Sequence, residues 1–266
     1  MRKILTTVIL LAALAGLAFG GWKLYDSFRA AAWEIEAGEA LEPSVVTEPP
    51  DQGDAAGGSD GSGGGTGGES GGGARPKERM PFDRLRSVNQ DIVGWLKVDG
   101  TEINYPVAQA ADNEYYLYWD VNRRRSIFGA LFLDYRDRPD FSDFSNVIYG
   151  HHIVNSSKMF QTLTRFKEQS FFETNRGGTL YTPETTYDLE LFAVLLTSPY
   201  DDVFEYAFPT PAAQQAHLDH IREKAMYYRE IGVTTADRLL VLSTCSYEYT
   251  EARTIVVARL ADQGMP

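Results

Sequence analysis

The residue best suited to do chemistry in this sequence is Cys245, the single cysteine of the chain. It ends an apolar run, residues 239–242, that continues through a serine and a threonine and predicts a buried strand. Arg253 follows eight residues later and leads into a second apolar run, residues 254–258. We expect both runs to be strands joined by a turn, with the cysteine and the arginine facing each other across it.

A cysteine needs a partner before it can act as a nucleophile, because its thiol is mostly protonated at neutral pH and only the thiolate attacks a carbonyl carbon. His151 is the candidate, since a short apolar strand, residues 146–149, and a turn-forming glycine precede it. The adjacent His152 is the alternative, and because neighbouring side chains of an extended segment point to opposite faces, the two histidines cannot easily reach one thiol together. Cysteine, histidine and arginine together supply the nucleophile, proton donor and positive charge that acyl transfer needs.

The order of these residues and their flanking motifs resembles the catalytic set of the sortases, the cell-wall transpeptidases of Gram-positive bacteria, and in detail their class B. A lone cysteine or a lone Gly-His pair is unspecific, whereas the ordered set is specific. The resemblance covers residues 80–262 and includes Tyr-Gly-His, Leu-Ser-Thr-Cys, the arginine and three further stretches: Asp-Ile-Val-Gly-Trp-Leu at 91–96, Ile-Asn-Tyr-Pro-Val at 103–107 and Gly-Ala-Leu-Phe-Leu-Asp-Tyr-Arg at 129–136.

The resemblance implies a role for each candidate residue. Cys245 would attack the carbonyl of a threonine in a sorting signal and form a thioacyl-enzyme, which a second amine would then attack. In the family the functional histidine directly follows the glycine, which selects His151 over His152 as general acid and base. Arg253 would stabilise the substrate carbonyl or its oxyanion. The residues flanking the nucleophile are the candidates for substrate binding: Ser243, Thr244 and Ser246.

The resemblance also implies the partners. The substrates would be surface proteins with a C-terminal sorting signal, and the acceptor amine would belong to a peptidoglycan precursor or to a pilin. No metal or other cofactor is expected. Three alternatives remain open: a pilin-polymerising sortase, an exported cysteine peptidase that only hydrolyses its acyl-enzyme, and a non-catalytic surface protein in which Cys245 is a small buried hydrophobe.

The first 25 residues predict a membrane anchor. Two positive charges precede an uncharged, mostly apolar run, residues 4–22. About 20 such residues cross a bilayer, with the positive end in the cytoplasm. A cleaved signal peptide is the alternative, because the run contains small-residue patterns of the kind that precede a cleavage site. Either segment exports the rest of the chain, and the anchor would hold a single-pass protein in the cell membrane with its catalytic domain outside.

Composition gives the remaining boundaries. Residues 26–78 are first acidic and then almost entirely glycine with serine, aspartate and threonine, which predicts a flexible linker. Residues 79–262 form the expected catalytic domain, and residues 263–266 form a short tail. The formal net charge of the chain is −12 and no basic stripe occurs, so we expect no nucleic-acid partner.

The expected fold is mainly β. Turn residues separate short apolar runs that predict strands and suggest a barrel: residues 93–98, 103–107, 130–134, 147–149, 179–181, 189–196, 239–243 and 254–260. Helices are expected at 82–89, at 157–166, and from 211 to 230, where Thr210 supplies an N-cap and a proline follows it. The resemblance implies the same plan, an eight-stranded sortase-type β-barrel with an N-terminal helix and a long helix inserted before the cysteine strand.

Two further features could hold a metal ion. His217 and His220 lie three residues apart on the last predicted helix, and residues 137–143 form an acidic loop. No cysteine or further histidine completes a site around the two histidines, so we expect both to be solvated helix residues. Calcium in the acidic loop is the other alternative, although members of class B are not expected to need it.

Overall fold

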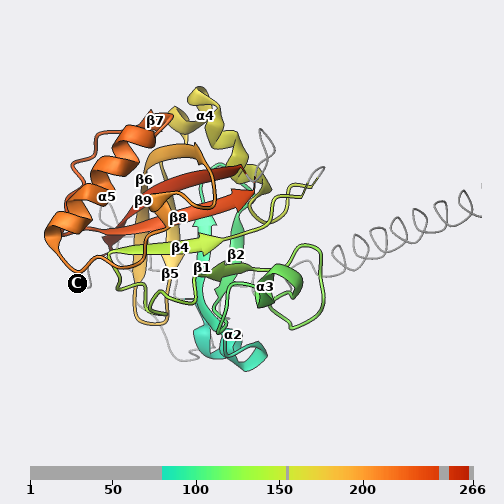
Figure 1. Cartoon of the computed structure of the whole chain (residues 1–266). Helices are drawn as coiled ribbons and strands as arrows, with labels where there is room; N and C mark the ends of the chain where they lie inside the picture. The colour runs from blue at the N-terminus through green and yellow to red at the C-terminus, as the bar shows by residue number, and fades with distance from the viewer. Residues whose placement is uncertain (1–79, 154–155, 246–251, 264–266) are drawn as a thin grey trace, which may run out of the picture.

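The computed structural model describes residues 80–263, apart from 154–155 and 246–251 (Figure 1). The predicted anchor, the predicted linker and Ser246 lie outside these residues. Across the part of the chain that is described, no helix has the length and apolar character needed to cross a membrane. The helices are α2 (Phe82–Val88), α3 (Tyr115–Tyr118), η1 (Gln161–Lys167), α4 (Gln169–Thr174), η2 (Asp202–Phe204) and α5 (Pro211–Lys224). The strands are β1 (Ile92–Val98), β2 (Asn104–Ala108), β3 (Leu131–Leu133), β4 (Ser145–Tyr149), β5 (Gly177–Tyr181), β6 (Thr186–Thr197), β7 (Tyr227–Tyr228), β8 (Arg238–Cys245) and β9 (Arg253–Asp262).

Eight of the strands form a closed barrel, which confirms the predicted fold. Their order is β5-β1-β2-β3-β4-β8-β9-β6, and pairing of β5 with β6 closes the ring. The short strand β7 adds to β6 beyond the residues that pair with β5. Because the ring is closed, the backbone groups of these strands find partners within the barrel and leave no long open edge.

Two strand pairs decide where the candidate residues lie. β4 and β8 run parallel, with Tyr149 beside Ser243, so both strands finish at the same end of the barrel. β8 and β9 run antiparallel, with Cys245 opposite Arg253, so β9 begins where β8 finishes. The residues that follow β4, end β8 and begin β9 are therefore gathered at one end of the barrel.

The central strands are buried on both faces, which explains why their sequences read as continuous apolar runs instead of alternating ones. In β8, Leu240 and Leu242 belong to the core inside the barrel. Leu239 and Val241 pack outside the barrel, in a second layer to which α5 contributes Leu218. In Figure 1, α5 is the orange helix that covers this outer layer. The barrel thus carries apolar cores on both sides of one sheet.

The long helix begins as predicted and ends earlier than predicted. The side chain of Thr210 accepts a backbone hydrogen bond in the first turn of α5 and so caps the helix. The predicted end at residue 230 is wrong, because α5 ends at Lys224. The amides of Met226 and Arg229 donate instead to carbonyls of β6, each at 2.7 Å. Pairing with the sheet has replaced the last turns of the predicted helix.

Short elements account for the other differences. The helix expected at residues 157–166 is the 3₁₀ helix η1, which α4 follows directly. α3, α4, η2 and β7 were not predicted. Each is too short to show a helical or strand period in the sequence, so its conformation depends on the elements packed around it.

Candidate active site

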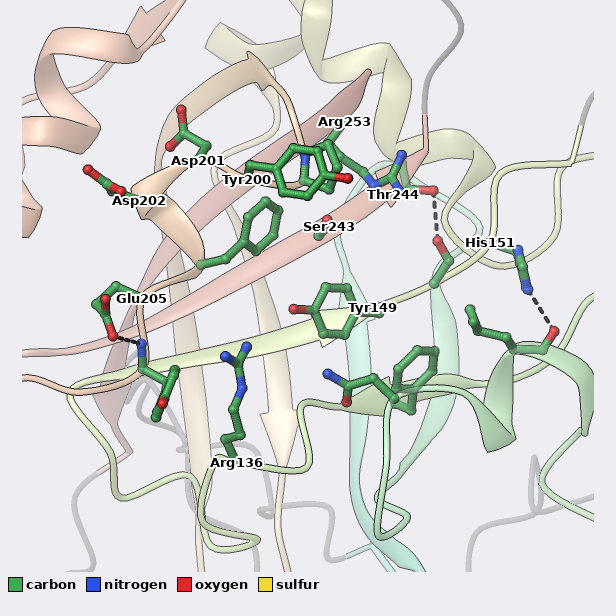
Figure 2. A pocket seen from close by; sticks show the side chains of 17 residues that line it. Arg136, Tyr149, His151, Tyr200, Asp201, Asp202, Glu205, Ser243, Thr244 and Arg253 are labelled. Atoms are coloured by element: carbon green, nitrogen blue, oxygen red, sulfur yellow. Dashed lines mark hydrogen bonds between the residues drawn. The ribbon is translucent and has the colours of Figure 1, made fainter. Parts of the chain in front are cut away.

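A groove of about 530 Å³ lies at the end of the barrel where β4, β8 and β9 meet (Figure 2). Its floor includes residues of β4 and β8, and His151 and Arg253 line it as well. Figure 2 shows these two side chains near Thr244 at one end of the groove, with Arg136 and Glu205 toward the other end. The groove therefore has a distinct end that carries the candidate catalytic positions.

His151 follows β4 and is oriented by a backbone carbonyl. Its Nε2 lies 2.8 Å from the carbonyl oxygen of Leu117, and because a carbonyl oxygen only accepts, Nε2 carries the proton. This leaves Nδ1 as the ring nitrogen that can exchange a proton with another group. Among the described residues that line the groove, His151 is present and His152 is not. The assignment of His151 as the catalytic histidine stays a prediction.

Gly150, directly before the histidine, has no room for a side chain. A Cβ at this position would lie 2.5 Å from Cδ2 of Leu131 and 2.7 Å from the ring of Phe160. The Gly150 amide donates to the carbonyl of Ser243 at 3.1 Å, and its carbonyl accepts the hydroxyl of Thr244 at 2.7 Å. These two hydrogen bonds fix the ends of β4 and β8 relative to each other just before the histidine and the cysteine.

Cys245 is the last residue of β8 and pairs in register with Arg253, the first residue of β9. The expected antiparallel pairing is therefore confirmed. Arg253 is half-buried and lines the groove, and its Nη1 lies 3.2 Å from the carbonyl oxygen of Ala252. The structure thus brings the backbone positions of the cysteine and arginine together, while their catalytic roles stay predictions.

The predicted substrate-binding residues differ in their surroundings. Ser243 lines the groove, and its buried Oγ has no hydrogen-bond partner among the described residues. Thr244 also lines the groove, but its hydroxyl is engaged by Gly150. Thr244 therefore supports the strand ends, whatever contact it makes with a substrate. Substrate binding by these residues and by Ser246 stays a prediction.

A buried carboxylate, Asp134, lies behind the side chains that line the groove, and the sequence did not reveal its importance. The carboxylate of Asp134 accepts three hydrogen bonds: from Nη2 of Arg136 at 2.7 Å, from the hydroxyl of Tyr149 at 3.0 Å and from Nδ2 of Asn113 at 3.0 Å. Burial alone would raise the pKa of Asp134, but hydrogen bonds from Arg136 and Asn113, together with the charge of Arg136, lower it and keep the carboxylate charged. One carboxylate thus fixes three groove-lining side chains. Asp134 and Arg136 lie in the sortase-like stretch 129–136, the signal that could have identified them.

One side of the groove is formed by the segment between β6 and α5, residues 198–206, which we call the groove wall. The ring of Phe204 stacks on Tyr149 with 6.1 Å between ring centroids. The guanidinium of Arg136 lies 4.2 Å from the ring centroid of Tyr206. The sequence carried no signal for this wall, because its residues form neither a periodic run nor a motif.

The two histidines of α5 are not the solvated residues that we expected. His217 is 5% exposed and packs against the rings of Phe144 and Phe208. Burial lowers the pKa of His217 to about 4, so it is neutral at pH 7. His220 is partly exposed, and its Nε2 lies 2.7 Å from Oδ1 of Asp201 in the groove wall. The prediction failed because this side of α5 packs against Phe144 and Phe208 at His217 and against the groove wall at His220.

Carboxylates of the acidic loop accept hydrogen bonds from nearby backbone amides. Asp137 accepts the amide of Val147 at 2.7 Å, and Asp143 accepts the amide of Arg138 at 2.6 Å. Burial raises the pKa of Asp137 to about 7. Within the described ranges, no group of three or more His, Cys, Asp or Glu side chains is placed to hold a metal ion.

Known proteins match this chain over the same region. A family model of the sortase domain matches residues 96–261. Sortase B of Staphylococcus aureus (strain NCTC 8325 / PS 47) is 34% identical over 184 residues, which are 68% of this chain and 75% of that protein. Sortase B of Listeria monocytogenes serovar 1/2a (strain ATCC BAA-679 / EGD-e) is 32% identical over 178 residues, which are 66% of this chain and 72% of that protein. A solved Staphylococcus aureus sortase B-substrate complex is similar with a TM-score of 0.65 and 33% identity, over 69% of this chain and 85% of that chain.

The family match begins within β1 and ends within β9, so it includes both strands of the cysteine and arginine pair. The resemblance seen in the sequence is confirmed by these relatives and by the barrel itself. This chain belongs to the sortase family of cysteine transpeptidases, and within it to class B.

Proposed function

We propose that this transpeptidase cleaves a C-terminal sorting signal after threonine and transfers the threonyl group to an amine, thereby attaching surface proteins to the cell wall. The observation that carries the proposal is the register pair of Cys245 and Arg253 at the groove end that His151 also lines. A nucleophile, a cation and a histidine at one end of a groove are the parts that acyl transfer requires. The Staphylococcus aureus relative solved as a substrate complex adds support.

In the first half-reaction, the Cys245 thiolate attacks the carbonyl carbon of the threonine. A C–S bond forms, and the C–N bond to the following residue breaks. The leaving nitrogen takes its proton from Nδ1 of protonated His151, while Leu117 holds the Nε2 side of the ring. Arg253 donates hydrogen bonds to the oxyanion that develops in the tetrahedral intermediate.

In the second half-reaction, an acceptor amine attacks the carbonyl carbon of the thioester. His151 accepts the proton that the amine loses, a C–N bond forms, and the C–S bond breaks to return the Cys245 thiolate. Water competes with the amine for the same thioester. Transfer and hydrolysis therefore share every catalytic residue and differ only in the group that attacks.

The proposal includes a location outside the cell membrane. The apolar run at residues 4–22 would anchor the chain, and the glycine-rich linker, residues 26–78, would tether the catalytic domain. A glycine-rich chain reaches roughly 5–6 Å times the square root of its length. Such a tether lets the domain search a shell of wall and membrane-proximal substrate. Expression of the full chain with a C-terminal epitope, followed by membrane fractionation and protease access to intact cells, tests this location.

The reaction is tested with the full chain in detergent micelles. Fluorogenic peptides with Pro-x-Thr-Gly and Pro-x-Thr-Asn cores are incubated with and without triglycine or a diaminopimelate-type amine, and products are identified by mass spectrometry. We expect an adduct between threonine and the amine that disappears in Cys245→Ala, His151→Ala and Arg253→Ala. Hydrolysis alone with every amine would favour a peptidase. The lack of any cleavage, together with a Cys245 that resists alkylation, would contradict the catalytic assignment.

A further inference from the structure

The groove wall, residues 198–206, has few backbone hydrogen bonds to hold it. Among the described residues, its backbone hydrogen bonds are local: the Asp201 amide donates to the Ser198 carbonyl at 3.3 Å, the Phe204 amide to the Asp201 carbonyl at 3.1 Å and the Glu205 amide to the Asp202 carbonyl at 3.1 Å. These bonds shape the turn of η2 but do not attach it to the barrel. Side chains must therefore set where the wall stands relative to the floor of the groove.

One of these side chains is apolar. Val203 is fully buried and packs in the outer core layer with Leu218 and Ile221 of α5. Apolar contacts of this kind hold the wall close to the helix but have little directional preference. They do not by themselves fix the orientation of the groove-facing residues on either side of Val203.

Asp201 provides the directional contact. One carboxylate oxygen accepts the hydroxyl of Thr197, at the end of β6, at 2.6 Å. The other accepts the amide of Val203 at 2.9 Å and lies 2.7 Å from Nε2 of His220 on α5. Three elements, β6, η2 and α5, therefore meet at one side chain, which itself lines the groove.

The environment favours this arrangement. The Asp201 side chain is 10% exposed and that of His220 is 21% exposed, so water competes weakly for their hydrogen bond. Burial alone would raise the pKa of Asp201, but hydrogen bonds from Thr197, His220 and the Val203 amide lower it. The carboxylate is therefore charged at neutral pH and accepts three donors at once. His217, one turn earlier on α5, adds a hydrogen bond with the backbone of Asp202.

We propose that His220 is a positioning residue for the sorting-signal groove: through Asp201 it holds the groove wall in the orientation that receives the substrate peptide. The proposal deepens the proposed function and rests on it. His220 is not among the described residues that line the groove, so it acts on the substrate only through the wall. His220 reaches the wall and not the strand ends that carry the candidate catalytic residues. Thr197, the other side-chain donor to Asp201, pairs with Arg253 through its backbone, and loss of His220 does not change that pairing. Loss of the contact should therefore weaken peptide capture and leave the chemical step intact.

The test compares His220→Ala with His220→Gln in the full chain. Glutamine offers an amide N–H at a similar reach and should restore the contact with Asp201, whereas alanine cannot. For a cleaved sorting peptide we expect His220→Ala to raise KM about 5- to 10-fold, which is the effect expected from loss of one charge-assisted hydrogen bond. The kcat should stay within about 2-fold of wild type. His220→Gln should recover most of the KM. Glu223→Ala, at an exposed position of the same helix, is the matched control.

Hydrogen exchange gives a second readout that does not need activity. The amides of Val203, Phe204 and Glu205 should exchange faster in His220→Ala than in wild type, while amides of β8 and β9 keep their protection. Thr197→Val removes the other side-chain donor to Asp201 and should give the same pattern, which covers the case in which His220→Ala folds poorly.

The two readouts separate the possible failures. If wild type cleaves no sorting peptide but the wall amides still respond to His220→Ala, the proposed function has failed and the contact itself stands. If KM and wall exchange are unchanged in both His220→Ala and Thr197→Val, the positioning role is wrong. A fall in kcat that matches the rise in KM, and that glutamine does not repair, would also overturn it.

Discussion

The two sides of the groove are built in different ways. The candidate catalytic end stands on β4, β8 and β9, where strand pairing fixes the position of Cys245 opposite Arg253 and of Tyr149 beside Ser243. The groove wall, residues 198–206, stands on side-chain contacts and one short 3₁₀ helix. If the proposed roles hold, the difference teaches how one fold can keep a reaction constant while its substrate varies: the chemistry would depend on paired strands and the selection on a loop.

The largest effect should come from the catalytic end. Arg253→Ala removes the cation that we propose stabilises the oxyanion, and it should lower kcat/KM for peptide cleavage by about 10²- to 10³-fold. Arg253→Lys should recover part of this loss, because lysine keeps the charge but lacks the planar fork of donors. Arg259→Ala, on the same strand and paired with Glu190, is the control and should change cleavage little. Equal activity in Arg253→Ala and Arg259→Ala would remove the basis for calling this end catalytic.

A second effect concerns the packing behind the wall and depends on pH. The pKa of His217 is about 4 in the folded protein, against an ordinary value near 6.5, because the ring is buried. The unfolded chain therefore takes up the proton first, and stability is lost as the pH falls from about 6.5 to about 4. The loss amounts to about 3 kcal/mol at most.

Chemical unfolding at a series of pH values measures this loss. His217→Gln should flatten the acid side of the profile, since the amide carries no proton to gain. His220, Asp201 and Glu205 also act electrostatically on His217, so the comparison is made with these residues unchanged. An acid slope that persists in His217→Gln would show that another group causes it.

A smaller effect should come from the hydrogen bond that joins the strand ends. Thr244→Val leaves the carbonyl of Gly150 without its 2.7 Å donor and should destabilise the protein by about 1 kcal/mol, with a kcat loss of about 10-fold. The matched control is Thr254→Val, because Thr254 lies at the register position opposite Thr244. The buried hydroxyl of Thr254 has no hydrogen-bond partner among the described residues. Denaturant titration should find Thr254→Val neutral or stabilising. Equal destabilisation by both changes would indicate general strand packing instead of the specific bond.

The smallest effect should come from the face of the wall. Phe204→Ala removes the ring that stacks on Tyr149 and should raise the peptide KM about 2- to 5-fold while kcat stays nearly constant. Met226→Ala, an exposed apolar position after α5, is the control. Steady-state kinetics measure KM and kcat for both variants and the wild type. A fall in kcat as large as that in Arg253→Ala would erase the distinction between the two sides of the groove.

Local patterns made much of the barrel predictable. The apolar runs that end at Cys245 and begin after Arg253 gave strands in the expected antiparallel pairing, and Thr210 gave the start of α5. The end of α5 was not predictable from the same evidence. The helical period continues past Lys224, but the amide of Met226 finds a carbonyl on β6, and the sequence of the helix holds no record of that partner.

The sequence by itself therefore determined the strand-forming segments, the cysteine and arginine pair and the sortase family, because each depends on residues close together in the chain or on their order along it. Only the tertiary structure decided that β4 lies parallel to β8, that His217 is buried, and that Asp201 meets His220. These contacts join residues far apart in sequence. Their free energy comes from burial and hydrogen bonds that exist only once the barrel has closed, so no local pattern encodes them.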